Sequence, residues 1–225
     1  MPLFEVNAQG QHGYPQPEDE YHRLVYSSYC LRCGISGQQI APFRFKRSQR
    51  AEHSDFLQIN WVYDAFFVSP EVAADLEIST ITGISFGPVL DPRTGGELGE
   101  WVQVLVPTII RCAETSRLPT VTCRPNNEEE IAFKSFTAGE KRYTPETPYC
   151  GRVKYHPPTS LAINLEGPGD TPDLFQTAEW FGSGGSAHRL TLASERFVAL
   201  VREHGWRGLA FDRVRESGIS ERDRK

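Results

Sequence analysis

The stretch Ser194–Val214, SERFVALVREHGWRGLAFDRV, decides the predicted fold, because it matches Ser69–Val89, SPEVAADLEISTITGISFGPV, without gaps at an offset of 125 residues. Five anchor positions carry the same residue in both stretches: Ser69, Ala74, Gly83, Phe86 and Val89 recur as Ser194, Ala199, Gly208, Phe211 and Val214. Three apolar positions at helical spacing also match: Val72, Ala73 and Leu76 align with Phe197, Val198 and Val201. The match predicts two copies of one structural module.

Each copy predicts a short helix, a turn and a strand. Both begin with a serine, a favoured helix N-cap, and continue with Pro70 or Glu195, which suit the first helical position. Gly83 and Gly208 then permit a sharp turn, since glycine readily adopts positive φ. Apolar residues two positions apart follow each glycine and indicate one face of a strand.

Two further segments are typical of strands. Residues 57–63 alternate large apolar side chains with polar ones, and Trp101–Val106 is a short apolar run that ends before Pro107. We therefore expect an α+β fold with a mostly antiparallel sheet, two helix–turn–strand modules and a CxxCG knuckle. We expect residues 1–225 to form a single domain.

Composition narrows the classes of function. The 225 residues carry a formal net charge of −5, and residues 51–150 hold 15 acidic but only 7 basic side chains. This excess acid argues against nucleic-acid binding and favours a basic protein partner. The first residues lack the pattern of a signal peptide, and no apolar run is long enough to span a membrane. We expect a cytoplasmic protein in a reducing compartment, with no membrane association.

The segment Cys30-Leu31-Arg32-Cys33-Gly34 has the spacing of a zinc knuckle. Two thiolates on one tight turn can reach a common tetrahedral metal ion, and the glycine permits the turn. A redox-active CxxC is less favoured, because no strand-to-helix context surrounds the pair. One knuckle supplies only half of a zinc site.

The segment Thr147-Pro148-Tyr149-Cys150-Gly151 repeats this frame, with threonine in place of the first cysteine. We interpret it as a decayed knuckle, and His156 is a candidate fourth ligand. The predicted zinc ligands are thus Cys30, Cys33, Cys150 and His156. Two alternatives stay open: Cys123 completes the set, or the thiols are buried without a metal.

The sequence contains no motif that supports an enzymatic function. Gly182–Ser186, GSGGS, is not a GxSxG nucleophile elbow, and no phosphate-binding loop, dinucleotide fingerprint, HExxH or EF-hand motif occurs. We predict a protein without catalytic activity.

The chain resembles the double-CXXCG motif family of bacterial immunity proteins, found in swarm-inhibition and other interbacterial toxin systems. The similarity spans about residues 28–214, and Thr147 departs from the second CXXCG. The matching residues are Cys30-Leu31-Arg32-Cys33-Gly34, Phe86-Gly87-Pro88, Cys150-Gly151-Arg152, Asp173-Leu174-Phe175, Ser194-Glu195-Arg196-Phe197-Val198 and Gly208-Leu209-Ala210-Phe211.

The resemblance implies an immunity protein that binds and neutralises a cognate protein toxin. Such inhibition needs a complementary surface and no reactive group. If the toxin is a nuclease, the acidic residues Glu128, Glu129 and Glu130 would mimic phosphates and contact it. The alternatives are a zinc-knuckle nucleic-acid-binding or regulatory protein, which would need a basic face, and an uncharacterised enzyme.

Overall fold

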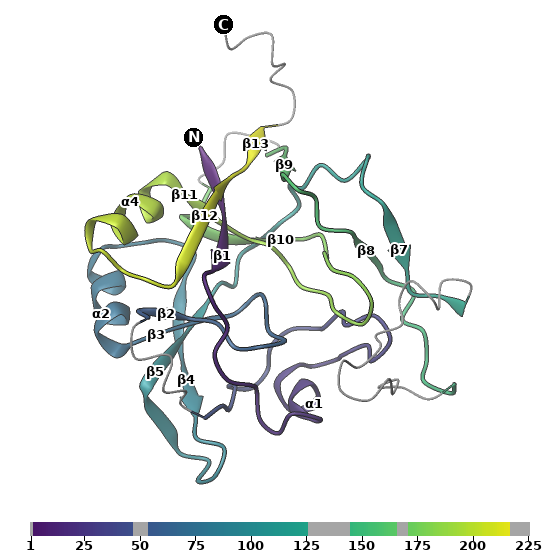
Figure 1. Ribbon diagram of the computed structural model, residues 1–225, viewed down its shortest axis with the longest axis horizontal. Helices are drawn as coiled ribbons and strands as arrows, with labels where there is room; N and C mark the ends of the chain where they lie inside the picture. The colour runs from purple at the N-terminus through teal and green to yellow at the C-terminus, as the bar shows by residue number, and fades with distance from the viewer. Residues whose placement is uncertain (1, 47–53, 126–144, 166–170, 217–225) are drawn as a thin grey trace, which may run out of the picture.

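The computed structural model describes residues 2–46, 54–125, 145–165 and 171–216. Its helices are α1 (Tyr21–Val25), α2 (Pro70–Ile78) and α4 (Glu195–Glu203). One sheet has the order β12 (Leu209–Arg213), β1 (Leu3–Ala8), β11 (Thr191–Ser194), β10 (Leu174–Thr177) and β6 (Ile109–Ile110). Another has the order β2 (Phe56–Leu57), β3 (Phe66–Val68), β5 (Glu97–Leu105) and β4 (Ser85–Leu90). Two small sheets pair β7 (Thr120–Thr122) with β8 (Val153–Tyr155) and β9 (Ala162–Ile163) with β13 (Arg215–Glu216) (Figure 1).

The strand pairs of the described residues are mostly antiparallel. The exceptions are β10 with β6 and β9 with β13, which run parallel. The predicted α+β class with a mostly antiparallel sheet is confirmed. Within the described ranges, every helix is too short or too polar to cross a membrane.

The predicted modules are present, and each is larger than the sequence match indicated. In the first, β3 leads into α2 and then β4, and in the second, β11 leads into α4 and then β12. Each pair of strands is bridged by a third strand, β5 in the first sheet and β1 in the other. Along the chain, β5 follows the first module, whereas β1 lies near the N-terminus, far before the second module. The two modules therefore have the same spatial arrangement, but the bridging strand comes from a different place in the sequence.

The helices begin where the serines predict. Ser69 and Ser194 accept hydrogen bonds on their side-chain oxygens from the backbone N–H groups of Val72 and Phe197, at 3.3 and 3.2 Å. Pro70 occupies the first turn of α2. These contacts satisfy N–H groups that a helix start leaves without a partner.

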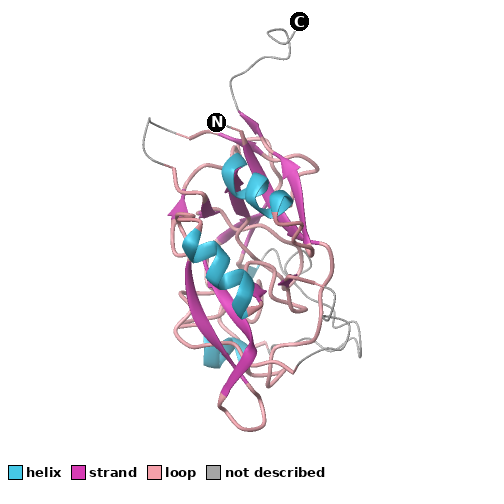
Figure 2. Ribbon diagram, turned by 90° about the vertical axis from the view of Figure 1, so that its left-hand side faces the viewer, coloured by secondary structure: helices cyan, strands magenta, loops and turns pink. Residues whose placement is uncertain are grey.

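The main core lies between the modules and combines residues of both. The apolar stripes of α2 and α4 are buried there, and both helices lie on the same side of the molecule (Figure 2). The residues that aligned in the sequence match, Val72, Ala73 and Leu76 with Phe197, Val198 and Val201, all belong to this core. The repeat is therefore scaffold that closes one hydrophobic core.

The modules contact each other reciprocally through their glycine turns. Gly83 has a φ of +84°, and a Cβ added there would lie 2.0 Å from the carbonyl oxygen of Leu174 on β10, in the sheet of the other module. Gly208 has a φ of +107°, and its Cβ would lie 2.2 Å from the carbonyl oxygen of Phe56. Real Cβ atoms do not approach a carbonyl so closely, so each turn requires glycine.

A carboxylate completes each of these contacts. Asp173, just before β10, accepts hydrogen bonds from the Thr82 N–H at 2.9 Å and from the Ser194 hydroxyl at 2.7 Å. Asp55, just before β2, accepts a 2.7 Å bond from the Arg207 N–H. Thr82 and Arg207 occupy equivalent positions in the two modules, one residue before the glycine. The interface between the modules thus has approximate two-fold symmetry.

Replacing Asp173 with asparagine is expected to lower the free energy of unfolding at pH 7 by about 1–3 kcal/mol, because several donors lose a charged acceptor. Burial alone would raise the pKa of Asp173, but its hydrogen bonds and the Arg196 guanidinium lower it below the usual value. The native carboxylate therefore stabilises the fold above its unfolded pKa, and this stabilisation is lost as pH falls through the depressed folded pKa. Urea unfolding across this range checks the prediction.

Asp212→Asn, which alters an exposed carboxylate bonded to Asn7, is the matched control. It should change stability by less than about 0.5 kcal/mol. Equal losses in the two variants would contradict the assignment of Asp173 to the module interface.

The strand predicted over residues 57–63 is largely wrong. β2 ends at Leu57, and Trp61 adopts a φ of +69°. Polar side chains redirect the chain: Gln58 donates to the Tyr63 carbonyl at 2.8 Å, and Asn60 to the Gly13 carbonyl at 2.6 Å. Such side-chain bonds to the backbone compete with sheet formation.

Candidate metal centre

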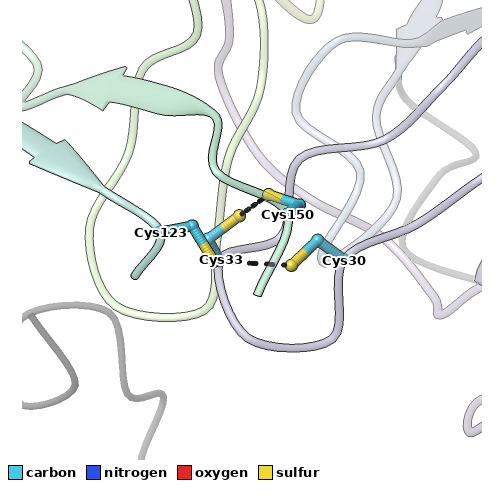
Figure 3. A group of neighbouring side chains, drawn as sticks. All are labelled: Cys30, Cys33, Cys123 and Cys150. Carbon is cyan, nitrogen blue, oxygen red and sulfur yellow. Dashed lines mark hydrogen bonds between the residues drawn. The ribbon is translucent and has the colours of Figure 1, made fainter. Parts of the chain in front are cut away.

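Four cysteines from three distant segments meet at one point: Cys30, Cys33, Cys123 and Cys150. Their sulfur atoms all lie within 4.8 Å of one another (Figure 3). The sulfur atoms of Cys33 and Cys150 are 3.5 Å apart, and those of Cys30 and Cys123 are 3.7 Å apart. All four are free thiols, and all but Cys150 are buried.

The first knuckle is a tight turn closed by its own backbone. The Gly34 N–H donates to the Cys30 carbonyl at 2.8 Å, and the Cys30 N–H donates to the Ile35 carbonyl at 3.0 Å. Gly34 has a φ of +80°, and a Cβ there would lie 2.3 Å from the Gly185 carbonyl oxygen. Glycine is therefore required both by the turn and by the neighbouring loop.

The second knuckle has the same backbone pattern but is assembled from two segments. The Gly151 N–H donates to the Cys123 carbonyl at 3.1 Å, and the Cys123 N–H donates to the Arg152 carbonyl at 2.9 Å. Gly151 has a φ of +72°. Cys123 therefore occupies, relative to Cys150 and Gly151, the position that Cys30 occupies relative to Cys33 and Gly34.

This geometry corrects the interpretation of a decayed knuckle. Thr147 stands in the first cysteine's place along the chain, but Cys123 fills that place in space. The Thr147 carbonyl instead accepts a 2.6 Å bond from Nε of Arg32. The β7–β8 hairpin brings Cys123 and Cys150 together, since Cys123 directly follows β7 and Cys150 lies shortly before β8.

The prediction of His156 as a metal ligand is wrong. The His156 N–H donates to the Pro119 carbonyl at 3.0 Å, at the end of the hairpin opposite the cysteines. Three residues of extended chain lie between Arg152 and His156, so the two are about 13 Å apart. The alternative in which Cys123 completes the set is the one that the structure supports. The predicted toxin contacts Glu128, Glu129 and Glu130 lie outside the described residues.

The cysteine set fits a tetrahedral metal ion such as zinc. With zinc–sulfur bonds of about 2.3 Å, the sulfur atoms of a regular tetrahedron are about 3.8 Å apart. The distances of 3.5 Å between Cys33 and Cys150 and of 3.7 Å between Cys30 and Cys123 are near this value. Four thiols at these distances could therefore hold the ion with small adjustments, and soft thiolate ligands favour zinc over hard cations.

The four thiols affect one another's ionisation, because they lie so close together. The hydrogen bond from Cys33 lowers the pKa of Cys30 to about 4, while the same contact raises the pKa of Cys33. Burial raises the pKa of Cys123 to about 11. Neighbouring thiolates repel one another and cannot all ionise, whereas a bound divalent cation deprotonates every coordinating thiol.

Basic side chains surround the cluster and fasten the loops that carry it. Buried Lys154 donates to the backbone carbonyls of Cys33 and Ser186, each at 3.0 Å, and to that of Gly184. Burial lowers the pKa of Lys154 to about 8, against the raising effect of the nearby thiols. Arg152 donates to the carbonyls of the first knuckle, at Ile35 and Ser36.

Arg32 links the first knuckle to the segment before Cys150. It donates to the Pro145 carbonyl at 2.9 Å, and its guanidinium carbon lies 4.0 Å from the centre of the Tyr149 ring. Together with Lys154 and Arg152, it places three cationic groups near a site that would be dianionic with zinc bound. This charge balance suits a metal thiolate better than four neutral thiols.

Neither a protein-family model nor a curated protein matches this chain.

Proposed function

We propose that this protein is a non-catalytic immunity protein in which Cys30, Cys33, Cys123 and Cys150 hold a structural zinc ion. The observation that carries the zinc part is the pair of knuckles with matching backbone hydrogen bonds and four convergent thiols. A structural zinc site is closed, with four protein ligands and no position for substrate or water. Zinc here would join segments that are far apart in the sequence.

The immunity part rests on the resemblance to the double-CXXCG motif family. Thr147 still departs from the second CXXCG of that family, but Cys123 restores a set of four thiols in space. Other matching residues serve the scaffold: Asp173 and Ser194 bond each other at the module interface, and Gly208 is required by its turn. In this proposal the scaffold presents a surface to a partner, while the partner carries the chemistry.

The acidic middle of the chain suits a basic toxin, which opposite charge would attract and orient. Glu128, Glu129 and Glu130 remain the proposed toxin contacts. Changing the three to lysine should weaken binding to a basic toxin, and an unaltered affinity would remove them from the proposal.

A nucleic-acid-binding zinc knuckle is the less favoured function. Such a protein needs lysine and arginine donors free to contact phosphates. Here Arg152 and Lys154, next to the knuckles, direct donors to backbone carbonyls instead.

Co-expression tests the immunity function directly. A toxin-like reading frame beside the gene for this protein should kill host cells when expressed alone, and this protein should restore growth and co-purify with the toxin. An Asp212→Asn variant, altered at an exposed carboxylate, should protect equally well. Absence of protection from each neighbouring candidate would overturn the immunity function, while elemental analysis of the purified protein independently decides the zinc part.

A further inference from the structure

A cleft lined by aromatic side chains lies beside the first knuckle. Its walls come from the segment around α1, from the turn at residues 61–64 and from the loop at residues 185–187. The lining residues that matter most are Tyr21, Tyr26, Tyr29, Trp61, Tyr63 and Asp64. Five aromatic rings and one carboxylate thus line the cleft. Tyr21 is buried and packs in a hydrophobic cluster, whereas Tyr63 is 37% exposed and available to a ligand.

Asp64 supplies negative charge to this cleft. Its backbone carbonyl accepts a 2.9 Å hydrogen bond from the Gln176 side chain, which fixes the turn that carries it. Burial raises the pKa of Asp64 to about 6, although hydrogen bonds from the backbone N–H groups of Asp64 and Arg189 and the positive charge of Arg189 act in the opposite direction. A carboxylate in such surroundings gains from a cation placed next to it.

Arg189, whose positive charge acts on Asp64, also binds backbone carbonyls of the neighbouring sheet. Arg189 donates to the backbone carbonyls of Thr177 and Ala178 at 2.7 and 2.8 Å. Its guanidinium carbon also lies 4.5 Å from the centre of the Trp180 ring. These contacts direct Arg189 toward the sheet, while Asp64 lines the cleft.

The backbone at Trp61 is held in an unfavourable conformation. Its φ of +69° is uncommon for a bulky residue and is energetically unfavourable. The Tyr14 ring lies 4.7 Å from the Trp61 ring and supports it from outside the cleft. Strain of this kind concentrates where a side chain must be presented to a ligand.

We propose that this cleft binds an organic cation, an alkylammonium or guanidinium group, between the aromatic rings and the Asp64 carboxylate. Aromatic rings attract cations through their negative faces, and a carboxylate adds a charged hydrogen-bond acceptor. The cation comes either from a lysine or arginine side chain of a partner protein or from a free quaternary ammonium compound. The site is separate from the zinc ligands and stands whether or not the immunity function does.

Calorimetric titration of the zinc-loaded full-length protein tests this site. The probes are choline, Nα-acetyl-arginine amide and Nα-acetyl-lysine amide, with 3,3-dimethyl-1-butanol as the uncharged isostere of choline. We expect at least one cation to bind saturably and, if it is choline, to bind at least tenfold more tightly than the isostere. Saturation by only the amino-acid amides identifies a polypeptide side chain, and saturation by only choline identifies a free ligand.

Asp64→Asn should weaken cation binding at least tenfold, and Tyr63→Leu, at an exposed ring, should weaken it with little effect on folding. Glu97→Gln removes the same charge from an exposed position on β5, outside the cleft, and should leave binding unchanged. Circular dichroism confirms that each variant is folded. The site is refuted if no cation saturates at about 100 mM, or if Glu97→Gln weakens binding as much as Asp64→Asn.

Discussion

Substituting serine for Cys123 is expected to reduce bound zinc from about one equivalent per chain to almost none. A serine hydroxyl is a poor zinc ligand at neutral pH, so the site keeps only three thiolates. Because the free energy of binding a structural zinc is also folding free energy, about 10–16 kcal/mol in small zinc-finger peptides, its loss should destabilise the region strongly. Elemental analysis and thermal unfolding with and without chelator measure both effects.

His156→Ala is the decisive control, because sequence reasoning placed the fourth ligand there. His156 lies at the far end of the β7–β8 hairpin, so this variant should keep its zinc and its chelator-sensitive unfolding. If His156→Ala lost its zinc and Cys123→Ser kept it, the ligand assignment would be reversed. If the wild-type protein contained no zinc and its thermal unfolding did not change with chelator, the proposed zinc site would be refuted.

The first knuckle could be predicted from the sequence because all of its chemistry is local. Cys30, Cys33 and Gly34 lie within five residues, and the turn that joins them follows from this spacing. The second knuckle could not be predicted in the same way, since 26 residues separate Cys123 from Cys150. Only the pairing of β7 with β8 joins the two cysteines, and that pairing is a tertiary contact.

A signal for this pairing was nevertheless present. Thr120–Thr122 and Val153–Tyr155 are both short runs with β-branched and aromatic residues, each beside a cysteine segment. A hairpin interrupted at its tip by a long insertion would have placed Cys123 next to Cys150. Closeness to Cys150 along the chain favours His156 as a ligand, but an extended strand moves it away by about 3.3 Å per residue.

The modules show the same division between local and tertiary information. The N-cap serines, the buried helix stripes and the two glycine turns follow from patterns within about twenty residues. The carboxylates of Asp55 and Asp173 perform equivalent roles, but the two residues are not 125 positions apart. The reason is that the segment between β2 and β3 and the segment between β10 and β11 differ in length. The contribution of β1 to the second module was equally hidden by its place near the N-terminus.

Gly208→Ala is expected to lower the free energy of unfolding by about 3 kcal/mol or more, from backbone strain and overpacking together. Its Cβ would lie 2.2 Å from the Phe56 carbonyl oxygen, and this backbone is held by the 2.9 Å bond from the Phe56 N–H to the Arg207 carbonyl. Neither side can move without separating the modules. Gly83→Ala should cause a similar loss, because its Cβ would lie 2.0 Å from the Leu174 carbonyl oxygen.

Gly205→Ala separates conformational strain from the steric clash. Gly205 also has a positive φ, +66°, but nothing lies within 4 Å of the Cβ that alanine would add. This variant should lose only about 1 kcal/mol, the cost of a left-handed alanine. Urea unfolding of the three variants gives the comparison. If Gly208→Ala were as stable as Gly205→Ala, the close contact between Gly208 and the Phe56 carbonyl would not hold the modules together. The symmetric interface would then no longer account for the internal repeat.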